Sequence, residues 1–243
     1  MAIGSTNLPG DWPEFPALPT LEQGQRLARD EFERRYLLRP DLKKAELIEG
    51  VVQMPSPVRI ERHSTPHAAI MGWLVFYWAF TPGVQAADNG AVRLDLGNEP
   101  QPDGFLFIKP ECGGRVRISS DDYVEGSPEL MVEVSASTVS TDLNDRFRAY
   151  ERNEVQEYIV WRVPERAIDW FVLRDGYFQP LSPDSLGCYR SEAFPGLWLA
   201  AQHMIHWDLP AVLQVLQQGL ASPGHAAFVA RLQSASSSSS SQP

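Results

Sequence analysis

A strand–helix–strand pattern in the second half of the chain limits the possible folds more than any other feature. Two short apolar segments, residues 130–134 and 158–163, flank a stretch over 141–153 in which apolar side chains recur at helical spacing. A helical pattern and several strand patterns precede this unit. The order of a helix, then strands, then strand–helix–strand predicts an α/β fold with a mixed sheet and helices packed on it.

The other elements follow from apolar spacing and turn residues. Thr20, with Gln23 three positions later, forms a capping-box pattern that predicts a helix ending before Pro40. Helical spacing predicts two further helices, over 66–80 and 209–220. Strands are predicted at 51–54, 91–96 and 104–108, and a hairpin is predicted to join 167–173 to 177–181.

Composition divides the 243 residues into three parts. Residues 1–19 are rich in Pro and Gly and are expected to form an irregular lead-in, whereas 20–222 are expected to form a single domain. Residues 223–243 are predicted to be a C-terminal tail. This tail is expected to be disordered from about residue 234, where a run of serines begins.

Cysteine content and hydropathy bear on the cellular compartment. Cys112 and Cys188 have no CxxC neighbour, so neither a zinc site nor a disulfide scaffold is expected, and a reducing cytosol fits best. Residues 1–16 lack the basic region and apolar run of a signal peptide. The longest apolar stretch, 68–80, is too short to span a membrane. We therefore expect a soluble, cytoplasmic protein.

The formal net charge of −10 bears on the partners of the chain. Proteins that bind nucleic acid without specificity usually carry a basic surface, which this chain lacks. Its basic clusters are small, at Arg34-Arg35, Lys43-Lys44 and Arg59. A metal-dependent nuclease is not excluded, because its site must itself be acidic.

Two carboxylates in or beside apolar strands need an explanation. Glu133 lies between two valines, where burial is costly unless the carboxylate is paired or binds a cation. Asp103 opens the strand at 104–108, and the separation of 30 residues allows a strand, a turn and a return. If the strands are neighbours, both carboxylates reach one point, where a hard divalent cation such as Mg²⁺ stabilises them.

Structural roles for the two acids are the alternative. Glu133 could form a salt bridge with one of three arginines, Arg93, Arg115 or Arg117. Asp103 could simply be a turn former at a strand start.

An ordered set of short motifs accompanies these acids. The sequence offers Glu46 to Gly50 (ELIEG), His67, Pro102-Asp103, Pro128 to Val134 (PELMVEV), Ser135 to Thr138, Asp142, Tyr150 and Val155 to Tyr158. This set resembles the PD-(D/E)xK nuclease superfamily, and more closely the bacterial endonuclease family often called Uma-two, over about residues 20 to 200. The resemblance implies a restriction-endonuclease-like fold, in which a central mixed sheet is flanked by helices in a single domain.

The resemblance also implies roles for individual residues. Asp103 and Glu133 correspond to the metal carboxylates, and the carbonyl of Val134 corresponds to a further ligand. Glu46 matches an N-terminal acid that can join the site through water. Ser135 occupies the position of the superfamily lysine and should share a strand face with Glu133.

The family places its lysine on the following helix, four residues before the tyrosine, and this chain has Arg146 there. An arginine is always protonated and cannot act as a general base, but it can hold a phosphate or stabilise negative charge. A salt bridge with Asp142, four residues earlier, is the structural alternative.

The function implied is a Mg²⁺- or Mn²⁺-dependent endonuclease that hydrolyses phosphodiester bonds in DNA and acts as a homodimer, with Asp103, Glu133, Arg146 and Glu46 in the catalytic site. The alternative hypothesis is a non-catalytic protein of the same fold that acts as a binding or regulatory module. The net charge and Arg146 favour this module, whereas the two intact carboxylates favour the nuclease.

Histidines and aromatic residues offer weaker candidates. His63 and His67 are four residues apart, but Pro66 interrupts a regular helix, so His63 is expected in a structural or loop role. His67 matches a family position at a helix start. His203 and His206 are expected to be packing residues. Three aromatic residues could form a base-stacking platform, but their helical spacing favours the core: Trp73, Tyr77 and Trp78.

Overall fold

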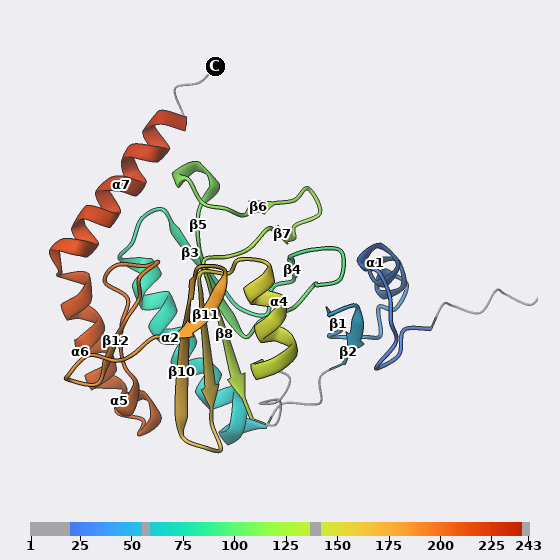
Figure 1. Ribbon diagram of the computed structural model, residues 1–243, viewed down its shortest axis with the longest axis horizontal. Helices are drawn as coiled ribbons and strands as arrows, with labels where there is room; N and C mark the ends of the chain where they lie inside the picture. The colour runs from blue at the N-terminus through green and yellow to red at the C-terminus, as the bar shows by residue number, and fades with distance from the viewer. Residues whose placement is uncertain (1–19, 55–58, 137–141, 240–243) are drawn as a thin grey trace, which may run out of the picture.

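The computed structural model describes residues 20–54, 59–136 and 142–239. At its centre lies a six-stranded sheet with the order β11-β10-β9-β8-β5-β3 (Figure 1). β8 runs parallel to β9, and the other neighbouring pairs are antiparallel. The strands are β3 (Val84–Ala87), β5 (Gly104–Ile108), β8 (Leu130–Ser135), β9 (Glu157–Arg162), β10 (Ala167–Arg174) and β11 (Tyr177–Pro180). The predicted α/β fold with a central mixed sheet is confirmed.

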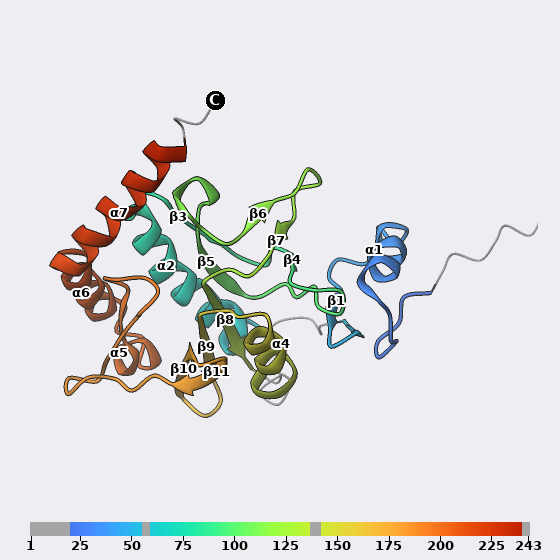
Figure 2. The ribbon, with the colours of Figure 1, turned by 45° about the horizontal axis from the view of Figure 1, so that its top comes forward.

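Helices cover both faces of this sheet, as Figures 1 and 2 show. The helices of one face are α2 (Thr65–Ala79), α5 (Ala201–Ile205), α6 (Leu209–Leu220) and α7 (Pro223–Ser239). Their apolar side chains form one core with the sheet, whereas α4 (Phe147–Arg152) packs on the other face. Side chains alternate along a strand, so Val132 and Val134 of β8 join the first core and Met131 joins the second.

An N-terminal unit lies beside α4 in Figure 1. It consists of α1 (Arg29–Leu37), β1 (Glu46–Ile48) and β2 (Val51–Gln53), with a small core that includes Phe32 and Leu47. β1 and β2 form a tight hairpin whose turn, Glu49 and Gly50, has positive φ angles at both positions. That is the backbone that a two-residue hairpin turn requires.

Short elements complete the fold. β4 (Val92–Arg93), β7 (Val124–Glu125) and β6 (Arg117–Ile118) form a small sheet, and β12 (Cys188–Arg190) pairs with β13 (Trp198–Ala200). Two π-helical turns, η1 (Ile60–Ser64) and η3 (Asp142–Arg146), lead into α2 and α4, and η2 (Pro110–Cys112) is a 3₁₀ turn.

The first helix begins later than the capping-box pattern predicts. Residues 20–28 are largely extended because their backbone bonds to the β1–β2 hairpin: Leu27 N–H donates to the Gly50 carbonyl, and Arg26 bridges Val51. The helix therefore starts only at Arg29. The strand predicted at 91–96 is also shorter, because Asp95 accepts hydrogen bonds from its own turn and ends the pairing after Arg93.

The C-terminal segment differs most from the prediction. Residues 223–239 form the helix α7 instead of a tail. Phe228 and Leu232 lie one turn apart and bury against the main core, each with only 2% of its surface exposed. The start of the serine run continues the helix, and Ser234 donates a hydrogen bond to the Ala230 carbonyl. The predicted lead-in at 1–19, position 141 of the predicted helix and residues 240–243 lie outside the described residues.

Within the described ranges, none of the helices is both long and apolar enough to cross a bilayer. Cys112 and Cys188 are both free thiols.

Candidate functional site

The pairing of β5 with β8 brings the two predicted carboxylates together. Gly104 lies opposite Val132 in this antiparallel register. Asp103 immediately precedes Gly104 and Glu133 immediately follows Val132, so both carboxylates belong to the same end of neighbouring strands. Both are buried, with 6% and 5% of their surface exposed.

The Asp103 carboxylate is held by a backbone donor and a histidine. Its Oδ2 accepts a hydrogen bond of 2.8 Å from the Val134 N–H, and His63 Nε2 lies 3.2 Å from both carboxylate oxygens. Burial alone would raise the pKa of Asp103, but the His63 contact and the Val134 N–H outweigh burial and lower the pKa below its ordinary value. Asp103 is therefore held in its ionised form.

His63 reaches Asp103 because of the local shape of the chain before α2. The π-helical turn η1 adds a residue to the turn and runs directly into α2, so His63 and His67 stack with ring centroids 5.9 Å apart. His67 Nε2 lies 2.7 Å from the Asp103 carbonyl oxygen. A structural or loop role was expected for His63. His63 lies in the π-helical turn η1 and not in a loop, and its contact with Asp103 is compatible with a structural role. Pro66 does not interrupt α2, because it stands in the first turn, where proline is tolerated.

Arg146 lies among three carboxylates. Its Nη2 donates to Glu46 across 2.7 Å and its Nη1 to Asp142 across 3.0 Å. Its Nε lies 3.2 Å from Glu133 Oε1, without the alignment of a hydrogen bond. The salt bridge with Asp142, the structural alternative for Arg146, is therefore present, and the alternative pairing of Glu133 with Arg93, Arg115 or Arg117 was wrong.

Glu133 has a second partner on α4, the helix that follows η3. Tyr150 donates its hydroxyl hydrogen to Glu133 Oε1 across 2.9 Å. Ser135 lies on the same strand face, as predicted, and donates its hydroxyl to Asp142. Burial raises the pKa of Glu133 well above its ordinary value, and the nearby Arg146 only partly opposes this, since Asp103, Asp142 and Glu46 add to the rise.

The comparisons with known proteins agree with this arrangement. The model of the Uma2 family, described as "Putative restriction endonuclease", matches residues 29–202. This chain belongs to the Uma2 family. A search of curated proteins found no match. Among solved structures, a chain described as a putative nuclease belonging to DUF820 from Anabaena variabilis ATCC 29413 is similar. It aligns with a TM-score of 0.55 at 16% identity, over 72% of this chain and 97% of its own.

The donor set of this Uma2 member fits a divalent cation. Four buried carboxyl groups, Glu46, Asp103, Glu133 and Asp142, share the region with a single guanidinium. An excess of buried carboxylates requires either protonation or a further cation. Asp103 and Glu133 would hold the ion. No group of three or more His, Cys, Asp or Glu side chains within the described ranges is arranged to bind a metal. The remaining ligands would therefore be water and substrate, as is usual for Mg²⁺.

The other candidate residues agree with their predicted roles only in part. The structure gives Val134 a role through its N–H, which donates to Asp103; the predicted role of its carbonyl stays a prediction. Trp73 and Tyr77 are buried in the core as expected, whereas Trp78 is 39% exposed. His203 and His206 are exposed at the end of α5 and bond to Asp208 and the Gln202 carbonyl, so the packing role expected for them was wrong.

Proposed function

We propose that this Uma2 protein is a metal-dependent endonuclease that hydrolyses phosphodiester bonds in DNA, with Mg²⁺ or Mn²⁺ held by Asp103 and Glu133. The observation that carries the proposal is the meeting of these two carboxylates, from neighbouring strands, inside a buried cluster with too few cations. Membership of a nuclease family supports the substrate class.

Different neighbouring side chains hold each of the two acids. His63 and the Val134 N–H keep Asp103 ionised and fix its orientation, so it offers a preformed ligand oxygen. Tyr150 and Arg146 fix the orientation of Glu133, whose pKa burial raises well above its ordinary value. When bound, Mg²⁺ supplies Lewis acidity toward the phosphodiester oxygens and makes a bound water more acidic.

Arg146 has a different role from the lysine of the family pattern. All three of its guanidinium nitrogens lie against protein carboxylates, and only 6% of the residue surface is exposed. We therefore propose that Arg146 positions Glu133 and reduces the repulsion among the acids. Glu46 acts through Arg146, because its Oε2 accepts from that side chain while its Oε1 accepts from the Gln101 N–H.

Cleavage of supercoiled plasmid in the presence of Mg²⁺ or Mn²⁺ tests the proposal. We expect D103N and E133Q to lose at least 100-fold in rate while remaining folded. The control is D175N, an exposed carboxyl change in the β10–β11 turn, which should cleave like the wild type. Metal-independent cleavage, or equal rates in D103N and the control, would contradict the proposal.

A binding or regulatory module is the second candidate, because Arg146 is fully engaged and no other arginine of the described residues forms an ion pair with Asp103 or Glu133. Metal titration separates the candidates. An ion that binds the folded state at one hundred times its Kd stabilises it by about 2.7 kcal/mol. A thermal shift with Mg²⁺ that is lost in D103N favours the nuclease, and no shift at millimolar Mg²⁺ favours the module.

We also propose that the active form is a homodimer, since a double-strand break needs two hydrolytic sites. Sedimentation of the free protein and of the protein with duplex DNA tests this. A monomer in both conditions that still linearises plasmid in one binding event would contradict it.

A further inference from the structure

A pocket opens at the end of the sheet where β8 and β9 finish, on the α2 side. Its volume is about 350 Å³, within the range of sites that bind small organic groups. Its walls come from η1, the start of α2, the end of β9 and the segment after α5. The principal lining residues are Glu61, Thr65, Trp161, Val163, Arg166 and Trp207. In Figure 1 the β9–β10 turn, the start of α2 and α5 gather at the lower end of the molecule.

Trp207 presents an aromatic face in this pocket. It is 45% exposed, whereas Trp161 behind it is almost fully buried, and the two ring centroids lie 5.7 Å apart. The Trp207 backbone has a φ of 64°, a conformation that a bulky side chain rarely adopts. Burial of the Trp207 side chain does not offset the cost of its unusual backbone conformation, because the side chain remains exposed to solvent. This combination favours a role in binding over a role in packing.

Charged groups surround the pocket mouth. Arg166 is exposed in the β9–β10 turn, and no carboxylate of the described residues forms an ion pair with it. Glu61 adds a hydrogen-bond acceptor to the lining. An aromatic face, a guanidinium group and one acceptor suit a nucleobase attached to a phosphate backbone.

The pocket is linked to the carboxylate site in two ways. Trp161 pairs with Val134 across the parallel β8–β9 register, and the Val134 N–H holds Asp103. Neighbouring strands lie about 5 Å apart. Glu61 and Thr65 flank His63 along the chain, and His63 contacts Asp103. Val134 and Trp161 face the α2 core, whereas Glu133 faces Tyr150 of α4, so the pocket and the carboxylates lie on either side of the sheet end. A strand of nucleic acid that passes around the ends of β8 and β9 would meet both places.

We propose that this pocket binds an unpaired nucleobase next to the scissile phosphodiester, by stacking it on Trp207 while Arg166 contacts the adjoining phosphate. The inference rests on the proposed function for its ligand class and adds a subsite to it. It predicts a preference for single-stranded, frayed or flipped substrate at that position, because a paired base cannot enter.

Binding of a fluorescein-labelled single-stranded 15-mer in EDTA tests the pocket separately from cleavage. We expect W207A to raise Kd by about 5-fold to 150-fold, the loss expected for one base–aromatic stack. W207F should recover most of this affinity, which shows that an aromatic face is needed. R166Q should reduce the slope of log Kd against log salt by about 0.7, the effect of one phosphate contact.

The matched control is W78A, which removes another partly exposed tryptophan, at the far end of α2. It should bind like the wild type. Equal Kd values for W207A, W78A and the wild type, or no binding of the oligonucleotide by the wild type, would overturn the pocket. Binding that depends on Trp207 in a protein that never cleaves DNA would instead overturn the nuclease proposal and leave the pocket standing.

Discussion

Arg146 on η3 donates a 2.7 Å hydrogen bond to Glu46 on β1, one hundred residues earlier in the chain. The contact joins the N-terminal hairpin to the segment that follows β8. It also places a single guanidinium between Glu46, Glu133 and Asp142. The N-terminal unit is thus part of the candidate site.

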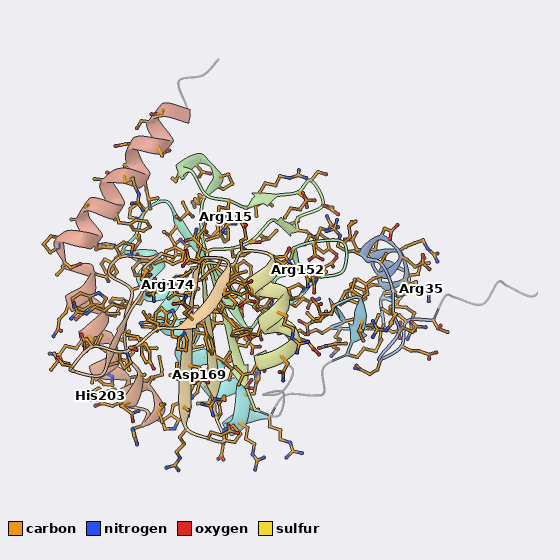
Figure 3. The ribbon with its side chains drawn as sticks, in the orientation of Figure 1. Arg35, Arg115, Arg152, Asp169, Arg174 and His203 are labelled. Atoms are coloured by element: carbon orange, nitrogen blue, oxygen red, sulfur yellow. The ribbon has the colours of Figure 1, made fainter. Side chains whose placement is uncertain are left out.

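Removing this guanidinium should be costly. We expect R146M to lower the free energy of unfolding by about 3–5 kcal/mol at pH 7, because it leaves buried carboxylates without their partner. Arg152, labelled in Figure 3, provides the control on α4, the helix that follows η3. It pairs with Glu49 at 2.6 Å, but 52% of its side-chain surface is exposed. R152M should cost at most about 1 kcal/mol. Urea titrations measure both, and similar losses for the two variants would contradict the role of Arg146.

Replacing His63 should make Asp103 harder to keep ionised. Without the imidazole, burial dominates and the pKa of Asp103 rises. A lowered carboxyl pKa contributes stability above the unfolded value of 3.8, and that stability is lost as pH falls through the folded pKa. We expect H63A to be about 1.5–3 kcal/mol less stable than the wild type at pH 7, with the gap narrowing in acid. The exposed H206A is the control, and a gap independent of pH would count against the pairing.

Glu99 predicts a pH dependence of opposite sign. Burial, followed by the hydrogen bond and charge of Glu33, raises the pKa of Glu99 from 4.5 to about 8. Among the described residues, the Glu99 Oε2 atom itself has no hydrogen-bond partner. A raised carboxyl pKa contributes stability that is complete below pH 4.5 and is lost as pH rises to about 8. We expect E99Q to flatten this dependence and to be more stable than the wild type at pH 9. Urea titrations at pH 6 and pH 9 measure it, with the exposed E165Q as control. An unchanged pH profile in E99Q would show that Glu99 does not titrate there.

The C-terminal helix should be part of the cooperative fold. F228A removes a ring that packs against Phe194 with centroids 6.3 Å apart, and we expect a loss of about 3–5 kcal/mol. S234A, an exposed change on the same helix, should cost under about 0.5 kcal/mol. Thermal melts distinguish the two. A helix that frays independently of the domain would give equal melting temperatures for F228A and the wild type.

The parts of the fold that sequence predicts well are those governed by local spacing. β5 (Gly104–Ile108) and α6 (Leu209–Leu220) have the predicted bounds because period and turn residues agree there. The capping-box pattern at Thr20 predicts the helix start too early, because residues 20–28 bond to the β1–β2 hairpin instead of forming the first turns. The serine run predicts disorder where the structure has a helix, because the buried Phe228 and Leu232 hold that helix against the core.

The candidate site was predictable only in part. Asp103 and Glu133 each stand beside an apolar strand, which marks them in the sequence. The threefold pairing of Arg146 was not predictable, because Glu46 approaches it only through tertiary contacts. His63 could have been found through its four-residue spacing from His67, had a π turn been considered. The pocket at Trp207 has no sequence signal beyond an isolated Trp.

The long reach from Glu46 to Arg146 has a consequence during synthesis. Translation releases β1 early, but the carboxylate cluster cannot form until η3 and α4 have left the ribosome and docked on the sheet. Domains fold as units while the chain emerges, so a nascent chain that ends before Arg146 carries the acids without their shared cation. The order of these elements along the chain therefore delays assembly of the carboxylate cluster until η3 has emerged.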